Sequence, residues 1–112
     1  VAFTIFLGDP ADYDGGELVI ESPLGTQEVK LAAGEAVVYP ASSVHRVAQV
    51  TRGQRLAAIG WAQSQVRDPA QREILYDLER IKRLMAERLP DAPETDWAFK
   101  VQANLLRMWA DP

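Results

Sequence analysis

The feature that most constrains the fold of this chain is a change in hydrophobic periodicity just past its middle. At the start of the chain, Val1, Phe3 and Ile5 alternate with residues of the opposite face, which is the pattern of a β-strand. In the last third, apolar residues such as Ile74 and Leu78 recur three or four residues apart, which is the pattern of an amphipathic helix. The sequence therefore predicts a β part followed by a helical part.

The first part, residues 1–63, is predicted to be almost wholly β. Turn signals containing Gly or Pro separate its apolar runs at intervals typical of a sandwich or barrel, and not of a βαβ fold. The turn at 22–25 is short enough to join the strands on either side of it as a hairpin. About six strands are expected, at residues 1–7, 17–21, 26–31, 35–39, 45–50 and 54–62.

The second part, residues 64–112, is predicted to form two helices. Asp68 is a suitable N-cap and Pro69 suits the first helical position, so we expect one helix over 69–88. Two prolines end it, and a second helix is expected from about 95 to 109. Because two short helices have little core of their own, we expect them to pack as an extension on the β part.

Composition excludes several classes of function. The 112 residues include 47% hydrophobic and 25% charged residues, which favours one small globular domain over a disordered chain. The net charge of −4 argues against a nucleic-acid partner, because such proteins need a basic face. The absence of cysteine excludes disulfides, thiolate zinc sites and iron–sulfur clusters. No apolar run approaches the ~20 residues of a membrane span, so we expect a cytoplasmic protein without a membrane partner.

His45 and Arg55 are the residues whose chemistry could be combined. His45 is the only histidine, and Arg55 follows ten residues later, beyond a predicted turn at 51–53. A hairpin there would place the two residues on adjacent antiparallel strands facing one cavity. An imidazole can bind a metal, and a guanidinium can bind a carboxylate through two hydrogen bonds. The pair would suit a metal-chelating organic acid with a second carboxylate.

Plainer interpretations of the same residues remain open. A single histidine near a turn is most often a surface or hydrogen-bonding residue, and a single arginine in a strand is most often solvated or salt-bridged. Gly15–Gly16 is most often only a turn. The acidic residues between 9 and 17 are typical of a solvated loop, because the spacing of a calcium-binding EF-hand is absent.

Several longer segments carry a resemblance to a known family. Residues 6–18 (FLGDPADYDGGEL), residues 34–47 (GEAVVYPASSVHRV) and residues 61–68 (WAQSQVRD) resemble segments of the PKHD-type, prolyl 4-hydroxylase-like hydroxylases that depend on iron(II) and 2-oxoglutarate. Residues 104–110 (NLLRMWA) are similar to the helical tail of the bacterial members. The resemblance extends over all 112 residues. It implies a double-stranded β-helix, a jelly-roll-like barrel, with helices outside it.

The resemblance also implies a site. Such hydroxylases bind iron(II) through two histidines and one carboxylate, and His45 matches the second histidine of that set. Arg55 matches the basic residue that binds the distal carboxylate of 2-oxoglutarate. The expected cofactors are iron(II) and 2-oxoglutarate, with ascorbate (vitamin C) as a further candidate. The expected reaction is hydroxylation of a peptidyl or small-molecule substrate, coupled to decarboxylation of 2-oxoglutarate to succinate.

The chain departs from the family pattern at the other two ligands. It contains no His-x-Asp pair, and it opens without Met inside a strand-like run. We therefore expect a barrel incomplete at its N-terminal side and a chain that is inactive by itself. An incomplete barrel would expose the strand at 1–7 as an edge, so we also expect a homo-oligomer. The alternative is a non-catalytic jelly-roll binding module without a metal site.

Overall fold

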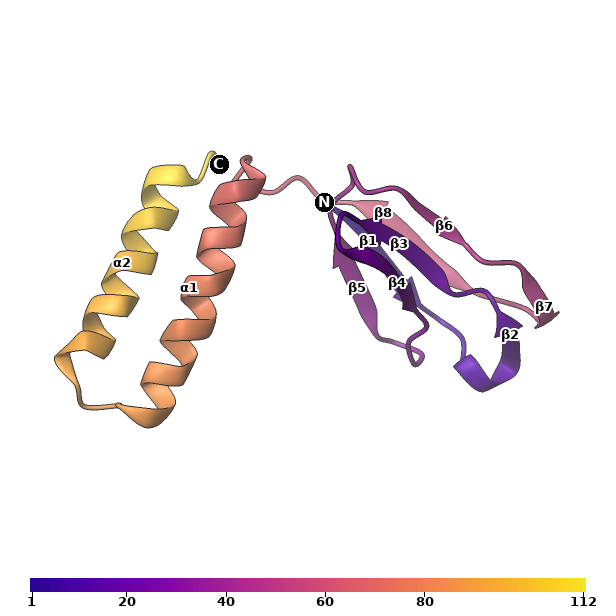
Figure 1. The fold of residues 1–112 in the computed structure, drawn as a ribbon, viewed down its shortest axis with the longest axis horizontal. Helices are drawn as coiled ribbons and strands as arrows, with labels where there is room; N and C mark the ends of the chain where they lie inside the picture. The colour runs from indigo at the N-terminus through magenta and orange to yellow at the C-terminus, as the bar shows by residue number, and fades with distance from the viewer. The chain divides into compact units, whose positions relative to one another are not determined.

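The computed structural model describes residues 1–112 as two compact units (Figure 1). Val1–Ala62 contains all eight strands and one short 3₁₀ turn at Pro10–Asp12, and Gln63–Pro112 contains two helices. The boundary lies where the hydrophobic periodicity changes, so the predicted division into a β part and a helical part is confirmed. Neither helix is long and apolar enough to cross a membrane.

The strands form three small antiparallel sheets and no closed barrel. Their orders are β5-β1-β8, β2-β7 and β4-β3-β6. The predicted hairpin around residues 22–25 is confirmed as the pairing of β3 with β4. The strands are β1 (Ala2–Phe6), β2 (Tyr13–Gly15), β3 (Leu18–Ser22), β4 (Gly25–Val29), β5 (Ala36–Tyr39), β6 (His45–Val47), β7 (Val50–Gly53) and β8 (Ala57–Trp61).

Strand β1 corrects one expectation about the edges of the β part. It pairs with β5 on one side and β8 on the other, so it is the central strand of its sheet and exposes no unpaired backbone edge. The expectation that residues 1–7 form an exposed edge strand is therefore wrong, and the edge-pairing argument for their role as the contact in a homo-oligomer no longer applies. The edges of the two larger sheets belong to β4, β5, β6 and β8.

The core of the β unit lies between its two three-stranded sheets. Ala2 and Phe6 of β1 contact Leu18 and Ile20 of β3, with Tyr39 of β5 in the same cluster. The alternation along β1 explains this arrangement, because every second side chain points to the same face of a strand. The sandwich that results gives rigid walls to the site described below.

The helical unit is a hairpin of α1 (Pro69–Arg88) and α2 (Pro93–Trp109). The Asp68 carboxylate accepts a hydrogen bond from the Ala70 backbone N–H at 2.8 Å, so the predicted N-cap is confirmed. Helix α2 begins about two residues earlier than expected, because a proline is well suited to the first turn of a helix. At that end, the Thr95 hydroxyl donates to the Leu89 carbonyl oxygen at 2.6 Å.

Candidate functional site

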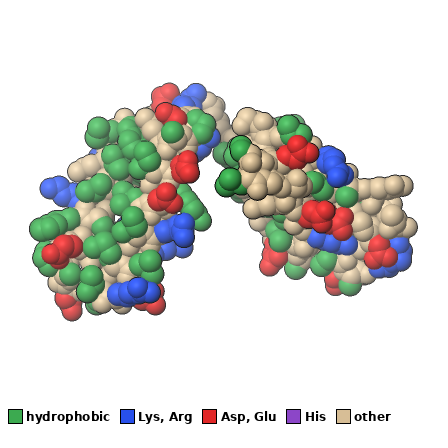
Figure 2. All heavy atoms as spheres, in the orientation of Figure 1, with side chains coloured by type: hydrophobic (Ala, Val, Ile, Leu, Met, Phe, Trp, Pro, Cys, Tyr) green, Lys and Arg blue, Asp and Glu red, His purple; other side chains and the backbone are tan.

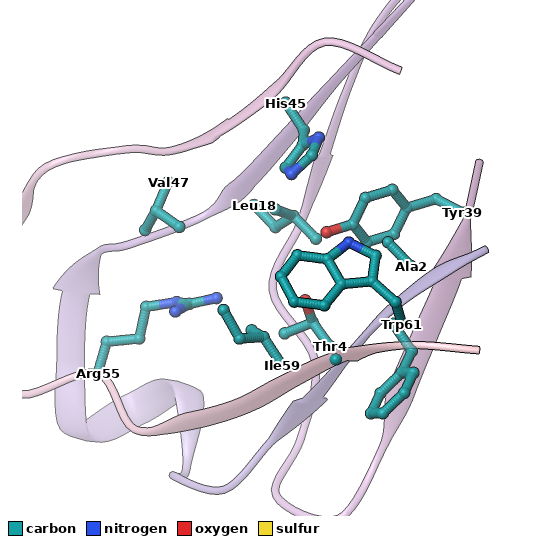
Figure 3. A pocket seen from close by; sticks show the side chains of 11 residues that line it. Ala2, Thr4, Leu18, Tyr39, His45, Val47, Arg55, Ile59 and Trp61 are labelled. Atoms are coloured by element: carbon teal, nitrogen blue, oxygen red, sulfur yellow. The ribbon is translucent and has the colours of Figure 1, made fainter. Parts of the chain in front are cut away.

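A cavity of about 240 Å³ lies within the β unit (Figure 3). Its walls come from β1, β3, β5, β6 and β8, and Arg55 reaches it from the connection between β7 and β8. Most lining residues are apolar, and none is an aspartate or glutamate. The residues that line it are Ala2, Phe3, Thr4, Leu18, Tyr39, His45, Val47, Arg55, Ile59, Gly60 and Trp61.

His45 lies at the first position of β6, and its ring turns toward the cavity (Figure 3). Its Nδ1 lies 2.8 Å from the Ser43 carbonyl oxygen. Because a carbonyl oxygen can only accept, Nδ1 carries a proton, and in the neutral ring Nε2 therefore has the free lone pair. The Tyr39 ring packs edge-on against the imidazole, with the ring centroids 5.1 Å apart. The neutral ring is therefore held in the tautomer that leaves Nε2 free to bind a metal.

Arg55 is the only lysine or arginine that lines the cavity, so its guanidinium supplies a permanent positive charge there. Its Nε is buried and has no hydrogen-bond partner in the protein. A buried donor without an acceptor costs about 1–3 kcal/mol. An oxygen atom of an anionic ligand would remove that cost, because a carboxylate accepts two parallel hydrogen bonds from a guanidinium. The arrangement is therefore suited to a carboxylate ligand.

The route by which these two residues meet differs from the prediction. They were expected on adjacent antiparallel strands, but β6 pairs with β3, β8 pairs with β1, and Arg55 itself precedes β8. The residues expected to form the turn between them, 51–53, instead belong to β7, which pairs with β2. The pairing was wrong, although both side chains do line one cavity.

The close approach of β2 and β7 explains why the glycine at position 53 was misread as part of a turn at residues 51–53. At Gly53, a β-carbon would lie 2.0 Å from the Asp12 carbonyl oxygen, and at Gly15 it would lie 2.0 Å from that of Gln49. Both glycines have positive φ angles. In the sequence, Gly53 suggests a hairpin turn. In the structure it belongs to β7 and lets that strand lie close to the backbone at Asp12.

Two residues of the cavity were missed or undervalued in the sequence. Thr4 is only 1% exposed and lines the cavity. Strand alternation places it on the same face as Ala2 and Phe6, but the sequence does not show which face of the strand is buried. Tyr39, for which core packing was the favoured role, both packs in the core and lines the cavity. Their hydroxyl groups add hydrogen-bonding capacity to an otherwise apolar wall.

The acidic residues between positions 9 and 17 have local structural roles. Asp9 accepts a hydrogen bond from the Ala11 backbone N–H and caps the 3₁₀ turn. Asp14 forms an exposed ion pair with Arg52 at 2.8 Å, which joins β2 to β7. The hydrogen bond from Arg52 lowers the pKa of the Asp14 carboxyl, and the pKa of Arg52 is correspondingly raised.

The residues of this chain fit the family's two cofactors unequally. Arg55, with its unpaired Nε, fits the distal carboxylate of 2-oxoglutarate. For iron, His45 offers one ligand, but no three His, Cys, Asp or Glu residues lie close enough together to hold a metal ion. A site of two histidines and one carboxylate therefore cannot be assembled from these residues alone.

Comparisons with known proteins point in one direction. The family model described as the 2OG-Fe(II) oxygenase superfamily matches residues 1–63. The chain is 53% identical to a PKHD-type hydroxylase of Maricaulis maris and 52% identical to PKHD-type hydroxylases of Synechococcus and of Xanthomonas axonopodis, in each case over 99% of its length. It spans about half the length of these relatives, between 49% and 51%.

Proposed function

The chain belongs to the 2OG-Fe(II) oxygenase superfamily, and we propose from this premise that its cavity is part of the active site of an iron(II)- and 2-oxoglutarate-dependent hydroxylase. The observation that carries the proposal is the unpaired Arg55 Nε in a cavity without carboxylates, which His45 also lines. One end of the cavity thus offers a cation for a carboxylate, and another offers an imidazole for a metal.

Each residue would have a distinct task. His45 would bind iron through Nε2, while the Ser43 carbonyl holds the proton on Nδ1. Arg55 would bind the distal carboxylate of 2-oxoglutarate, and apolar residues such as Leu18 would exclude water around it. When bound, iron(II) and 2-oxoglutarate would use dioxygen as the oxidant, so that one oxygen atom enters a substrate C–H bond and the other enters succinate as carbon dioxide is released. The protein's own contribution is to position these groups.

The two remaining iron ligands would come from residues outside this sequence. The relatives are about twice as long as this chain, which leaves room for them in the natural gene product. We accordingly propose that these 112 residues alone do not turn over 2-oxoglutarate. A peptidyl or small-molecule substrate, ascorbate as a further cofactor, self-association, packing of the helices on the barrel and a cytoplasmic location stay predictions.

The decisive variant for iron is His45→Ala in the natural gene product that contains these residues. We expect it to abolish succinate formation from 2-oxoglutarate with iron(II) and dioxygen, because it removes a metal ligand. Arg46→Ala is the matched control, since Arg46 is the next residue of β6, is exposed and does not line the cavity. Unchanged succinate formation by His45→Ala would contradict the assignment.

A non-catalytic binding module remains the second candidate. It is favoured by the observation that no three potential ligands lie close together in these residues. The two candidates differ in metal binding by the natural gene product. A hydroxylase should bind one iron(II) per chain and lose it in His45→Ala. A binding module should retain carboxylate binding at Arg55 without binding iron.

A further inference from the structure

Gly16 lies where the Arg55 side chain passes on its way into the cavity. The residue follows β2 and has a φ angle of +70°. A β-carbon at this position would lie 3.1 Å from Arg55 Cδ, 3.0 Å from Tyr13 Cε2 and 3.1 Å from Val50 Cγ2. These distances are shorter than ordinary van der Waals contacts, so a side chain here would push against the Arg55 stem. The missing side chain leaves the space that the stem occupies.

Phe6 constrains the other end of the same side chain. Its ring is fully buried, and the Arg55 Cζ lies 5.5 Å from the ring centroid. A guanidinium is attracted to the face of an aromatic ring at this range. The stem is thus confined at Gly16 and the charged head at Phe6, two residues from different elements of the β unit.

We propose that Gly16 and Phe6 are positioning residues that aim Arg55 into the cavity before any ligand binds. The inference rests on the proposed function, in which Arg55 binds the distal carboxylate of 2-oxoglutarate. A free arginine side chain has many rotamers, and ordering it during binding weakens affinity. A side chain that is already held in place avoids that loss. Gly16 would therefore have a role in ligand selectivity.

Gly16→Ala, made in the natural gene product, tests this proposal, with Gly34→Ala as its matched control. Both glycines have positive φ angles, +70° and +87°, so alanine is strained at either position. An added β-carbon at Gly34 would meet no atom within 4 Å, whereas at Gly16 it meets Arg55. The two variants therefore share the backbone strain and differ in the contacts with Arg55, Tyr13 and Val50, of which only Arg55 lines the cavity.

The readout is the ratio of the dissociation constants for 2-oxopentanoate and 2-oxoglutarate, measured by calorimetry. The two acids differ at the distal carboxylate, so the ratio reports on Arg55, while a general loss of structure weakens both. We expect Gly16→Ala to lower the preference for 2-oxoglutarate by roughly three- to tenfold, the value of one ordered side chain. Gly34→Ala should retain it. A Gly16→Ala variant with an unchanged ratio would overturn the proposal.

Two further measurements keep the test decisive. If Gly16→Ala does not fold, Phe6→Leu, which keeps most of the apolar volume but removes the ring face, should also lower the ratio, and an unchanged ratio would overturn the proposal. The NMR signal of the Arg55 Nε–H, identified by its absence in Arg55→Ala, requires no ligand. It should shift in Phe6→Leu or Gly16→Ala, and an unshifted signal would also overturn the proposal. A wild type without any preference for 2-oxoglutarate would instead reject the proposed function.

Discussion

The β unit and the helical unit bury their side chains to very different extents. In the β unit, Phe6, Tyr13 and Leu18 are at most 2% exposed. In the helical unit, only Val66 and Thr95 are buried. The candidate site lies in the unit with the packed core, because a cavity keeps its shape only when its walls are fixed by close packing.

A polar network links the two helices of the helical unit. The Lys82 ammonium donates to Gln102 and pairs with Glu79, and the Gln102 amide donates to the Glu79 carboxylate. This network joins α1 to α2. By contrast, large apolar side chains such as Trp97 and Met108 remain exposed in this unit, and Figure 2 shows hydrophobic side chains spread over its visible face. The comparison teaches that the β unit has a buried apolar core, whereas much of the apolar surface of the helical unit stays exposed.

The largest expected effect comes from one chemical change made once in each unit. Leu18 is 2% exposed and Leu106 is 43% exposed. We expect Leu18→Ala to lower the free energy of unfolding by about 2–5 kcal/mol, because it leaves a cavity in the core. Leu106→Ala should cost under about 1 kcal/mol, as is usual for substitutions near the surface. Urea unfolding of the two variants beside the wild type provides the measurement.

Equal costs for the two leucine variants would break the comparison. Such a result would mean that Leu106 is as well covered in solution as Leu18. A small cost for both would mean instead that the β core is loosely packed, and the cavity would then lack fixed walls.

A smaller effect should appear when the pH is lowered. Hydrogen bonds from Lys82, Gln102 and Arg83 lower the pKa of Glu79 from 4.5 to about 2. Since the carboxylate binds protons more weakly in the folded state, its stabilisation is complete above pH 4.5 and is lost as the pH falls toward 2. We expect the thermal unfolding of the helices, followed by circular dichroism, to show this loss.

Glu79→Gln isolates this contribution from that of the other carboxylates. The variant should be less stable than the wild type near neutral pH, and the difference should shrink between pH 4.5 and 2. A difference that stays constant with pH would show that the charge of Glu79 is not what stabilises the hairpin.

The smallest effect is expected for Asp14→Asn in the exposed β2–β7 ion pair. This variant should unfold at nearly the same urea concentration as the wild type, because exposed ion pairs contribute little to stability.

Much of the fold could be predicted from local patterns. The division between the units, the β3–β4 hairpin and the Asp68 cap all depend on residues that are near neighbours in the sequence. The partners of β6 and β7 could not be predicted in this way, because β6 pairs with β3 and β7 pairs with β2, and the paired residues are 25 or more positions apart in the sequence. Strand partners at that distance are chosen by packing, which local periodicity does not encode.

The candidate site, like the fold, could be predicted from the sequence only in part. Residue chemistry and the family resemblance pointed to His45 and Arg55, and the cavity contains both. Neither indicated Thr4, whose burial depends on the sheet facing β1, or the fit of the Arg55 stem beside Gly16. Those contacts join segments from opposite ends of the β unit, so they appear only in the folded chain.

The most direct test of the central claim, that Arg55 binds the distal carboxylate of 2-oxoglutarate, is a calorimetric titration of the natural gene product. The wild type, Arg55→Ala and Arg46→Ala would each be titrated with 2-oxoglutarate and with 2-oxopentanoate. We predict that the wild type and Arg46→Ala prefer 2-oxoglutarate. We predict that Arg55→Ala loses that preference, at a cost on the order of 2–5 kcal/mol for a buried charge pair. An Arg55→Ala protein that still prefers 2-oxoglutarate to the same degree would contradict the account.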